Sequence, residues 1–178
     1  MKTLAISMLT VCGIDELSVH KAGLVTHVLS VLDPDLPEIE AFQNYGAHHR
    51  TTLRFHDIID PQTGMIHPTP EHVGAILRFG SDLASSSGDR QDGHLLVHCH
   101  MGVSRSTAAM LALLAQVDPS EDEDVLFARL RQIRPGAWPT RAWSDMPIIF
   151  WAAKAAWCRR CANITACSLN VSRSFTIG

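Results

Sequence analysis

A short apolar run that leads through a tight loop into an alanine-rich segment constrains this fold more than any other feature. Residues 94–98 read His-Leu-Leu-Val-His, which is continuous enough for a central strand buried on both faces. The loop contains one glycine, and residues 104–117 are rich in Ala and Leu, which favours a helix. A buried strand followed directly by a helix is typical of α/β folds.

The rest of the chain alternates in the same way. Short aliphatic or β-branched runs predict strands at 4–12, 25–32, 51–56 and 94–99. Helices are predicted at 15–22, 37–45, 69–85, 104–117, 121–133 and 141–158. Ser120 is expected to cap the helix that begins with the acids at 121–124. The pattern predicts an α/β three-layer sandwich, with a central, mostly parallel sheet flanked by helices.

Length and charge limit the organisation and the partners. The 178 residues suit one domain, expected at 1–160, and a C-terminal tail at 161–178 that lacks a clear period. The net charge of −3 gives no bulk electrostatic reason to bind nucleic acid or an anionic membrane. No apolar stretch reaches the roughly 20 residues that span a bilayer. The apolar N-terminal run resembles a weak leader, but a buried first strand is the favoured interpretation.

The cysteines favour a reducing compartment. Their number, 5, is odd and their spacing irregular, which excludes a complete disulfide framework and indicates a cytoplasmic protein. Cys12 is interpreted as a buried core thiol. Cys158, Cys161 and Cys167 lack a fourth ligand for zinc, and so does His98-Cys99-His100, so no metal is expected.

The loop after the predicted central strand has the composition of an anion site. The first amides of a helix have no partner within the helix, and the helix dipole adds positive potential there. Gly102 allows the tight turn that lets successive amides surround an oxyanion. Cys99 at the base of such a loop is favoured as a thiolate, and therefore as a nucleophile. Arg105 can fold back and hold two phosphate oxygens with its planar fork.

The order His-Cys, five residues, Arg and Ser resembles the phosphate loop of the protein tyrosine phosphatase superfamily, and most of all its dual-specificity branch and bacterial relatives. The resemblance implies that Cys99 forms a phosphocysteine intermediate, that Arg105 binds phosphate and that Ser106 assists hydrolysis. His98 would hold the loop by hydrogen bonds. In some relatives a second cysteine traps the oxidised nucleophile as a disulfide, so the resemblance gives a redox partnership with Cys99 as the alternative role of Cys12. The phosphate-binding residues would be His100, Met101, Gly102, Val103, Ser104 and Arg105.

Cleavage also needs an acid that protonates the leaving oxygen, and a positioned carboxyl group supplies roughly 10²–10⁴-fold. The superfamily carries this acid on a loop after a strand. Here Asp57 in Phe-His-Asp is the favoured candidate, and Asp60 is the alternative. The segment 134–140 also resembles the family, with Thr140 where Asn is expected, and is interpreted as structural.

The substrate class follows only in outline. Residues 100–104 contain no lysine, which argues against a highly charged phosphoinositide and favours phosphotyrosine or mixed phosphoprotein substrates. A small-molecule, phosphoinositide or RNA 5′-phosphatase is the alternative enzyme, and a phosphate-binding pseudophosphatase is the alternative non-enzyme. No cofactor is expected, because loop amides and Arg105 supply the electrostatic stabilisation.

Overall fold

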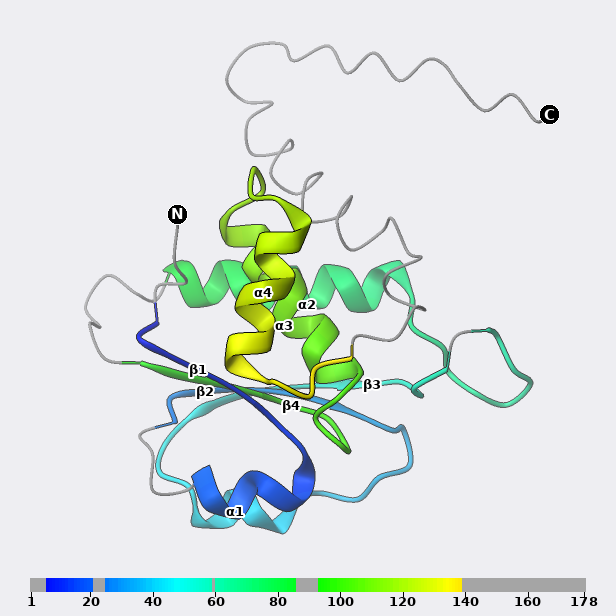
Figure 1. Cartoon of the computed structure of the whole chain (residues 1–178). Coiled ribbons are helices and arrows are strands. Elements are labelled where there is room, and N and C mark those ends of the chain that lie inside the picture. Colours follow the sequence, from blue (N-terminus) through cyan, green and yellow to red (C-terminus); the bar gives the residue numbers. More distant parts are fainter. Residues whose placement is uncertain (1–5, 21–24, 59, 86–92, 139–178) are drawn as a thin grey trace, which may run out of the picture.

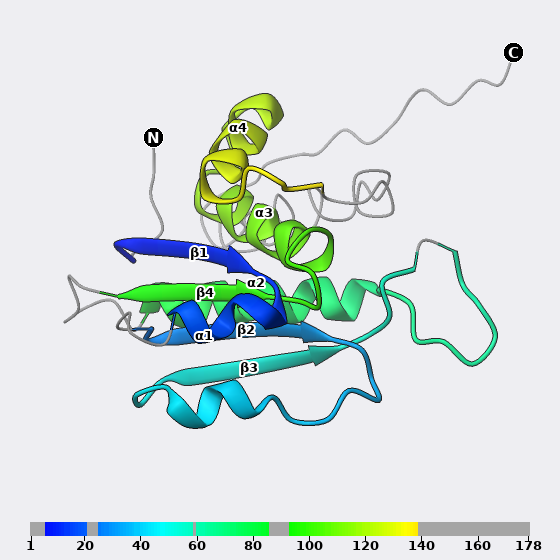
Figure 2. The same cartoon turned by 60° about the horizontal axis from the view of Figure 1, so that its bottom comes forward.

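The computed structural model describes residues 6–20, 25–58, 60–85 and 93–138. Within these ranges a single sheet contains four strands in the order β1-β4-β2-β3, and all neighbouring pairs are parallel (Figure 1). The strands are β1 (Met8–Cys12), β2 (His27–Leu32), β3 (His49–Arg54) and β4 (His94–His98). All four arrows point the same way in Figure 2, so their carboxyl ends meet at one edge of the sheet.

Strand β4 lies in the middle of the sheet and is buried along its whole length. Its last residue, His98, is in register with Cys12 of β1 and with Ser30 of β2. The continuous apolar run of this segment is explained by that position, because a central strand covered on both faces has no solvent side. The residue after His98 therefore emerges between the ends of β1 and β2.

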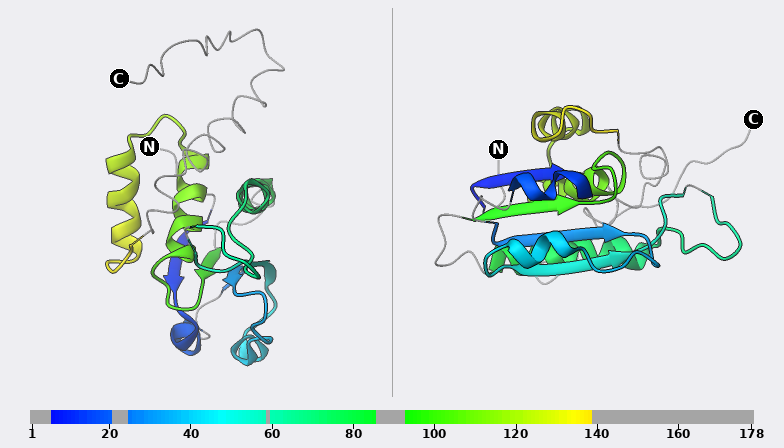
Figure 3. Two further views of the ribbon diagram at one scale, coloured as in Figure 1. Left: turned by 90° about the vertical axis from the view of Figure 1, so that its right-hand side faces the viewer. Right: turned by 90° about the horizontal axis from the view of Figure 1, so that it is seen from below.

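Helices cover both faces of the sheet, as the sequence predicts. The longer helices α2 (Pro70–Ser85), α3 (Arg105–Val117) and α4 (Glu123–Ile133) lie on one face. The short elements η1 (Ile14–Glu16), α1 (Leu17–His20) and η2 (Glu40–Asn44) lie on the other, where η1 and η2 are 3-10 helices (Figures 1 and 3). The three-layer α/β sandwich is confirmed.

Alternation along β4 divides the apolar core between the two faces. Leu95 and Val97 join the larger cluster, which contains the buried side of α3. Leu96 points to the opposite side and joins the smaller cluster with Leu17 and Phe42. Successive side chains of a strand point to opposite faces, so one five-residue strand packs against both helical layers. This double anchoring gives the loop after β4 a rigid starting point.

The elements predicted within the described residues are present, with shifted boundaries. The segment 37–45 forms only a short 3-10 helix, and Ser120 is not a helix cap. Helix α4 is capped instead by Asp122, whose Oδ1 accepts the Asp124 N–H at 2.9 Å, while Ser120 donates to Asp118. A carboxylate two positions closer to the helix can reach its free amides, and the serine cannot.

The predicted last helix and the boundary at 160/161 lie outside the described residues. None of the helices in the described part of the chain has the length and apolar character that a bilayer crossing requires.

Candidate active site

The loop between β4 and α3 turns sharply against the end of β1. Gly102 has φ +69°, and a Cβ placed there would lie 2.4 Å from the carbonyl carbon of Cys12. Both the left-handed backbone and this close approach exclude a side chain. The N–H of Ile14 donates to the carbonyl oxygen of His100 at 2.9 Å, so β1 and its following turn support the loop from behind.

Cys99, the predicted nucleophile, sits at the base of this loop and is 2% exposed. Its Sγ lies 3.1 Å from Ser106 Oγ and accepts the backbone N–H of Gly102 at 3.3 Å. These two contacts fix the position of the sulfur at the base of the loop. Ser106 lies in the first turn of α3, within hydrogen-bond distance of the sulfur. Its part in hydrolysis stays a prediction.

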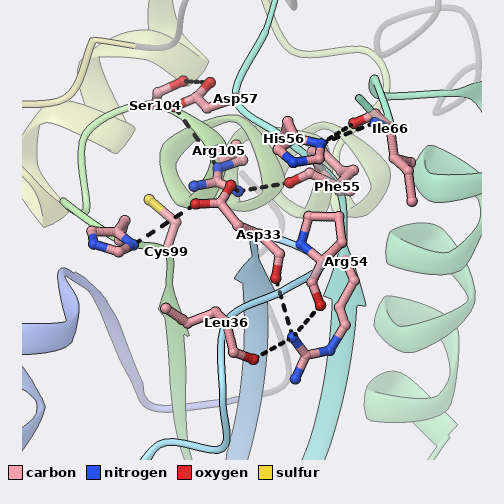
Figure 4. Close-up of polar contacts among 12 residues, drawn as sticks. Asp33, Leu36, Arg54, Phe55, His56, Asp57, Ile66, Cys99, Ser104 and Arg105 are labelled. Atoms are coloured by element: carbon pink, nitrogen blue, oxygen red, sulfur yellow. Dashed lines mark hydrogen bonds and ion pairs between the residues drawn. The ribbon is translucent and has the colours of Figure 1, made fainter. Parts of the chain in front are cut away.

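Arg105 is buried, with 3% of its side chain exposed, and it is held on one side of its guanidinium. Nη1 donates to Asp33 Oδ1 at 2.8 Å and to the backbone oxygen of Phe55 at 2.7 Å. Nε lies 3.8 Å from Asp57 Oδ2. Figure 4 shows Cys99, Arg105 and the two carboxylates gathered at the carboxyl ends of the strands.

Asp57, the favoured general acid, contacts the loop directly. Its Oδ1 accepts a hydrogen bond from Ser104 Oγ at 2.7 Å, and its side chain is 38% exposed (Figure 4). It can therefore reach both the site and solvent, as an acid that exchanges protons must. Asp60 is an exposed residue further along the same connection. The geometry supports the choice of Asp57, and its role stays a prediction.

His98 ties the end of β4 to β2. Its Nε2 lies 2.7 Å from Ser30 Oγ, which also accepts a hydrogen bond from Arg50 Nε at 3.0 Å. Burial, with the nearby Arg50 charge, lowers the pKa of His98 to about 4. The ring is therefore neutral at pH 7. A structural role fits this environment, as the sequence suggests.

Arg134 and Glu16 brace the outer side of the loop. Arg134 Nε donates to the Gly102 oxygen at 3.2 Å, and Nη1 donates to Glu16 Oε1 at 2.8 Å. Glu16 Oε2 in turn accepts the Gly13 N–H at 2.7 Å. The bond from Arg134, followed by that from Gly13, lowers the pKa of the Glu16 carboxyl. These contacts give Arg134 a structural role, whereas Thr140, the predicted helix cap of this segment, lies outside the described residues.

Cys12 is fully buried at the end of β1, in register with His98 and so beside the start of the loop. Burial is the main cause that raises its pKa to about 12, and the Glu16 charge adds to it. The thiol is therefore protonated at neutral pH. These surroundings fit the interpretation as a core cysteine, and the redox alternative stays open.

Sequence reasoning missed Asp33, Glu16 and Arg134 as neighbours of the loop. A signal existed for Asp33: it follows a buried strand directly, as Cys99 does and as Asp57 nearly does. In parallel α/β sheets, ligands bind outside the carboxyl ends of the strands, so polar residues there are candidates for a shared site. No comparable pattern marks Glu16, and Arg134 is marked only by the resemblance of the segment 134–140 to the family. Within the described residues, no group of three or more His, Cys, Asp or Glu could hold a metal ion.

One known protein family matches the part of the chain that contains the loop and the helices around it. The family described as protein-tyrosine phosphatase matches residues 63–142, a range that includes Cys99, Arg105 and Ser106. This part of the chain is therefore similar to the cysteine-dependent protein tyrosine phosphatases, as the sequence resemblance implies. A search of curated proteins finds no significant match to this chain.

Solved structures of dual-specificity phosphatases share the fold. DUSP15 aligns at 18% identity and a TM-score of 0.62, covering 93% of this chain and 97% of that chain. Human DUSP28 aligns at 14% identity and 0.61, covering 89% and 96%. PTPMT1 in complex with PI(5)P aligns at 13% identity and 0.60, covering 89% and 97%. At these identities the likeness concerns the fold.

Proposed function

We propose that this phosphatase hydrolyses phosphomonoesters through a phosphocysteine intermediate on Cys99, with phosphotyrosine or mixed phosphoproteins as substrates. The observation that carries the proposal is the convergence on one loop of a buried Cys99 sulfur bonded to Ser106, a buried Arg105 and the Asp57 carboxyl. These are the nucleophile, the anion clamp and the proton donor that the reaction needs.

In the first step the Cys99 thiolate attacks phosphorus, and the bond from phosphorus to the substrate oxygen breaks. Asp57 gives its proton to that oxygen, so the leaving group departs as a neutral alcohol or phenol. Arg105 and the loop amides stabilise the charge on the equatorial oxygens. The Ser104 hydroxyl donates a hydrogen bond to Asp57 Oδ1 at 2.7 Å and so keeps the acid beside the loop.

In the second step water attacks the phosphocysteine, and the Asp57 carboxylate accepts a proton from that water. The sulfur–phosphorus bond breaks, inorganic phosphate forms and Cys99 leaves as a thiolate. Ser106 Oγ, 3.1 Å from the sulfur, donates a hydrogen bond to the thiolate as it forms. The contact lowers the energy of the departing group and thus favours hydrolysis.

Phosphoinositides are the second candidate substrate class, because the similar PTPMT1 structure contains PI(5)P. The charge of this site argues against them. Asp33 and Asp57 face Arg105 from two strand ends, and the loop interior contains no lysine. An inositol ring with further phosphates would meet these carboxylates.

A reducing compartment such as the cytoplasm suits an enzyme that depends on a free thiol.

Turnover of p-nitrophenyl phosphate in EDTA and reductant tests the proposal. We expect Cys99→Ser to abolish activity and Asp57→Asn to reduce it. Full activity in Cys99→Ser would refute the proposal. A panel of phosphotyrosine and phosphoserine peptides, inositol phosphates and RNA 5′-phosphates then ranks the substrate classes, and a preference for inositol phosphates would replace the phosphoprotein assignment.

A further inference from the structure

The donors of Arg105 are unevenly used. A guanidinium has five N–H groups: two on each Nη and one on Nε. Both hydrogens of Nη1 are occupied, one by Asp33 Oδ1 at 2.8 Å and one by the Phe55 backbone oxygen at 2.7 Å. Nε is fully buried and makes no hydrogen bond among the described residues, because the carboxylate that faces it, Asp57 Oδ2, is 3.8 Å away and beyond hydrogen-bond distance. A buried donor without a partner is costly, so its presence at this site points to a missing acceptor.

The edge formed by Nε and Nη2 presents two parallel N–H groups, which is the geometry that binds two oxygens of a phosphate. Rotation of the guanidinium would replace this edge by the one containing Nη1. Asp33 opposes such a rotation, because it accepts from Nη1 with a full negative charge. The hydrogen bond to the charged Asp33 carboxylate is stronger than the one to the neutral Phe55 carbonyl.

We propose that Asp33 is a positioning residue that orients Arg105, so that the Nε and Nη2 edge faces the phosphate. This assignment rests on the proposed function of the loop as a phosphate site. It concerns a residue outside the loop motif, at the end of a different strand.

The backbone around Asp33 is built to hold the carboxylate in place. Arg54 Nη1 lies 3.1 Å from the Asp33 and Pro34 oxygens and 2.8 Å from the Leu36 oxygen (Figure 4). Leu36 N–H closes the turn onto the Asp33 oxygen at 3.3 Å. Although 37% of the Asp33 side chain is exposed, its backbone is thus fastened to β3. A carboxylate on a fastened turn can impose an orientation on Arg105.

The second carboxylate oxygen faces the loop itself. Asp33 Oδ2 lies 4.0 Å from His100 Nδ1, so a protonated His100 would pair with it. Asp33 therefore lies between the buried arginine and the first residue after Cys99. Because Asp33 lies beside the anion site, its negative charge could also act by simply repelling the anion. The experiment must separate this repulsion from the positioning of Arg105.

The experiment measures protection of Cys99 from iodoacetamide by tungstate, a tetrahedral oxyanion, in parallel with kcat/KM for an aryl phosphate. The variants are Asp33→Ala, which removes the acceptor, and Asp33→Asn, which keeps an oxygen for Nη1. Asp35→Ala, an exposed carboxylate two residues away, is the matched control. Asp33→Ser, whose hydroxyl is too short to reach Nη1, replaces the alanine variant if that variant does not fold.

Positioning predicts that Asp33→Ala raises the tungstate concentration for half-protection about tenfold, with a similar loss in kcat/KM, because one charged hydrogen bond is lost. Unprotected alkylation should change less than about twofold, since the hydrogen bonds at the sulfur involve Ser106 and Gly102 rather than Arg105. Asp33→Asn should recover most of the affinity, and Asp35→Ala should match the wild type.

Unchanged or tighter tungstate binding in Asp33→Ala would overturn the inference, because Asp33 would then act only by repulsion. A wild type that tungstate protects but that hydrolyses no phosphomonoester would refute the proposed function, and the effect of Asp33→Ala on protection would still decide the inference. A wild type that tungstate does not protect would refute both.

Discussion

The two sides of the phosphate loop are built differently. On the inner side, Arg105 meets the carboxylates of Asp33 and Asp57. On the outer side, backbone atoms of the loop are held by Arg134 and by the turn after β1, and the acid there, Glu16, pairs with Arg134 instead of approaching the sulfur. Both sides contain an arginine and acid pair, and the proposed mechanism gives a chemical role to the inner pair alone.

This difference teaches how each side contributes. In the proposed mechanism Arg105 and Asp57 on the inner side would contact the substrate phosphate and the leaving oxygen, and would therefore act on the energy of the transition state. Groups on the outer side act through the shape of the loop and through stability. The loss of activity caused by a substitution on the inner side should therefore depend on the substrate. A substitution on the outer side should lower activity toward all substrates by a similar factor.

The largest expected effect comes from Arg105→Lys. Lysine keeps the charge but cannot provide two parallel donors, so kcat/KM should fall about 10³-fold, in the range seen when a preorganised donor is lost. Arg134→Lys is the matched change on the outer side and should cost no more than about fivefold, because a partly exposed ion pair contributes little. Steady-state kinetics with an aryl phosphate compares them. Equal losses would show that the two arginines are not distinct in role.

Asp57→Asn should lower kcat about 10²-fold for an alkyl phosphate and much less for p-nitrophenyl phosphate, whose leaving group needs little protonation. Glu16→Gln, the matched change on the outer side, should lower kcat for both substrates by the same small factor. For each variant, the measurement is the ratio of kcat for the alkyl phosphate to kcat for p-nitrophenyl phosphate. A substrate-independent loss in Asp57→Asn would point away from a general acid and send the search to Asp60.

Gly102→Ala tests the outer side through stability. The left-handed backbone and the 2.4 Å approach to Cys12 should together cost about 2–3 kcal/mol of unfolding free energy, measured by urea denaturation. Gly136→Ala, where a Cβ would meet nothing within 4 Å, is the control and should change stability by less than about 0.5 kcal/mol. A small loss in Gly102→Ala would contradict the tight fit of the loop against β1.

The last prediction concerns the pH dependence of stability that the buried His98 causes. Its folded pKa of about 4 lies below the ordinary value of 6.5, so the unfolded chain binds a proton first as the pH falls. The stabilisation from neutral His98 is complete above pH 6.5 and is lost between 6.5 and 4. His98→Asn should therefore lessen the dependence of unfolding free energy on pH by at most about 1.4 kcal/mol per pH unit. Parallel slopes for the variant and the wild type would show that His98 does not titrate on unfolding.

Part of this architecture follows from local patterns. The strands at β2, β3 and β4 and the helices α2 to α4 are predicted from periodicity, and only their ends shift. Short segments such as 37–45 were less well predicted, because their form depends on packing: Phe42 inserts into the smaller core and holds only a 3-10 turn. Ser120 was wrong as a cap because a neighbouring acid, Asp122, competes for the same helix terminus.

The sequence by itself determined the chemistry within one strand–loop–helix unit. Cys99, Gly102, Arg105 and Ser106 lie within eight positions, and chain connectivity brings them together whenever a buried strand leads into a helix through this loop. Only the tertiary structure decided which other groups join them. Strand order and register bring Asp33 and Asp57 to Arg105, and they bring Glu16 to Arg134 across 118 positions. Such contacts depend on how separate strands pair, which no local pattern specifies.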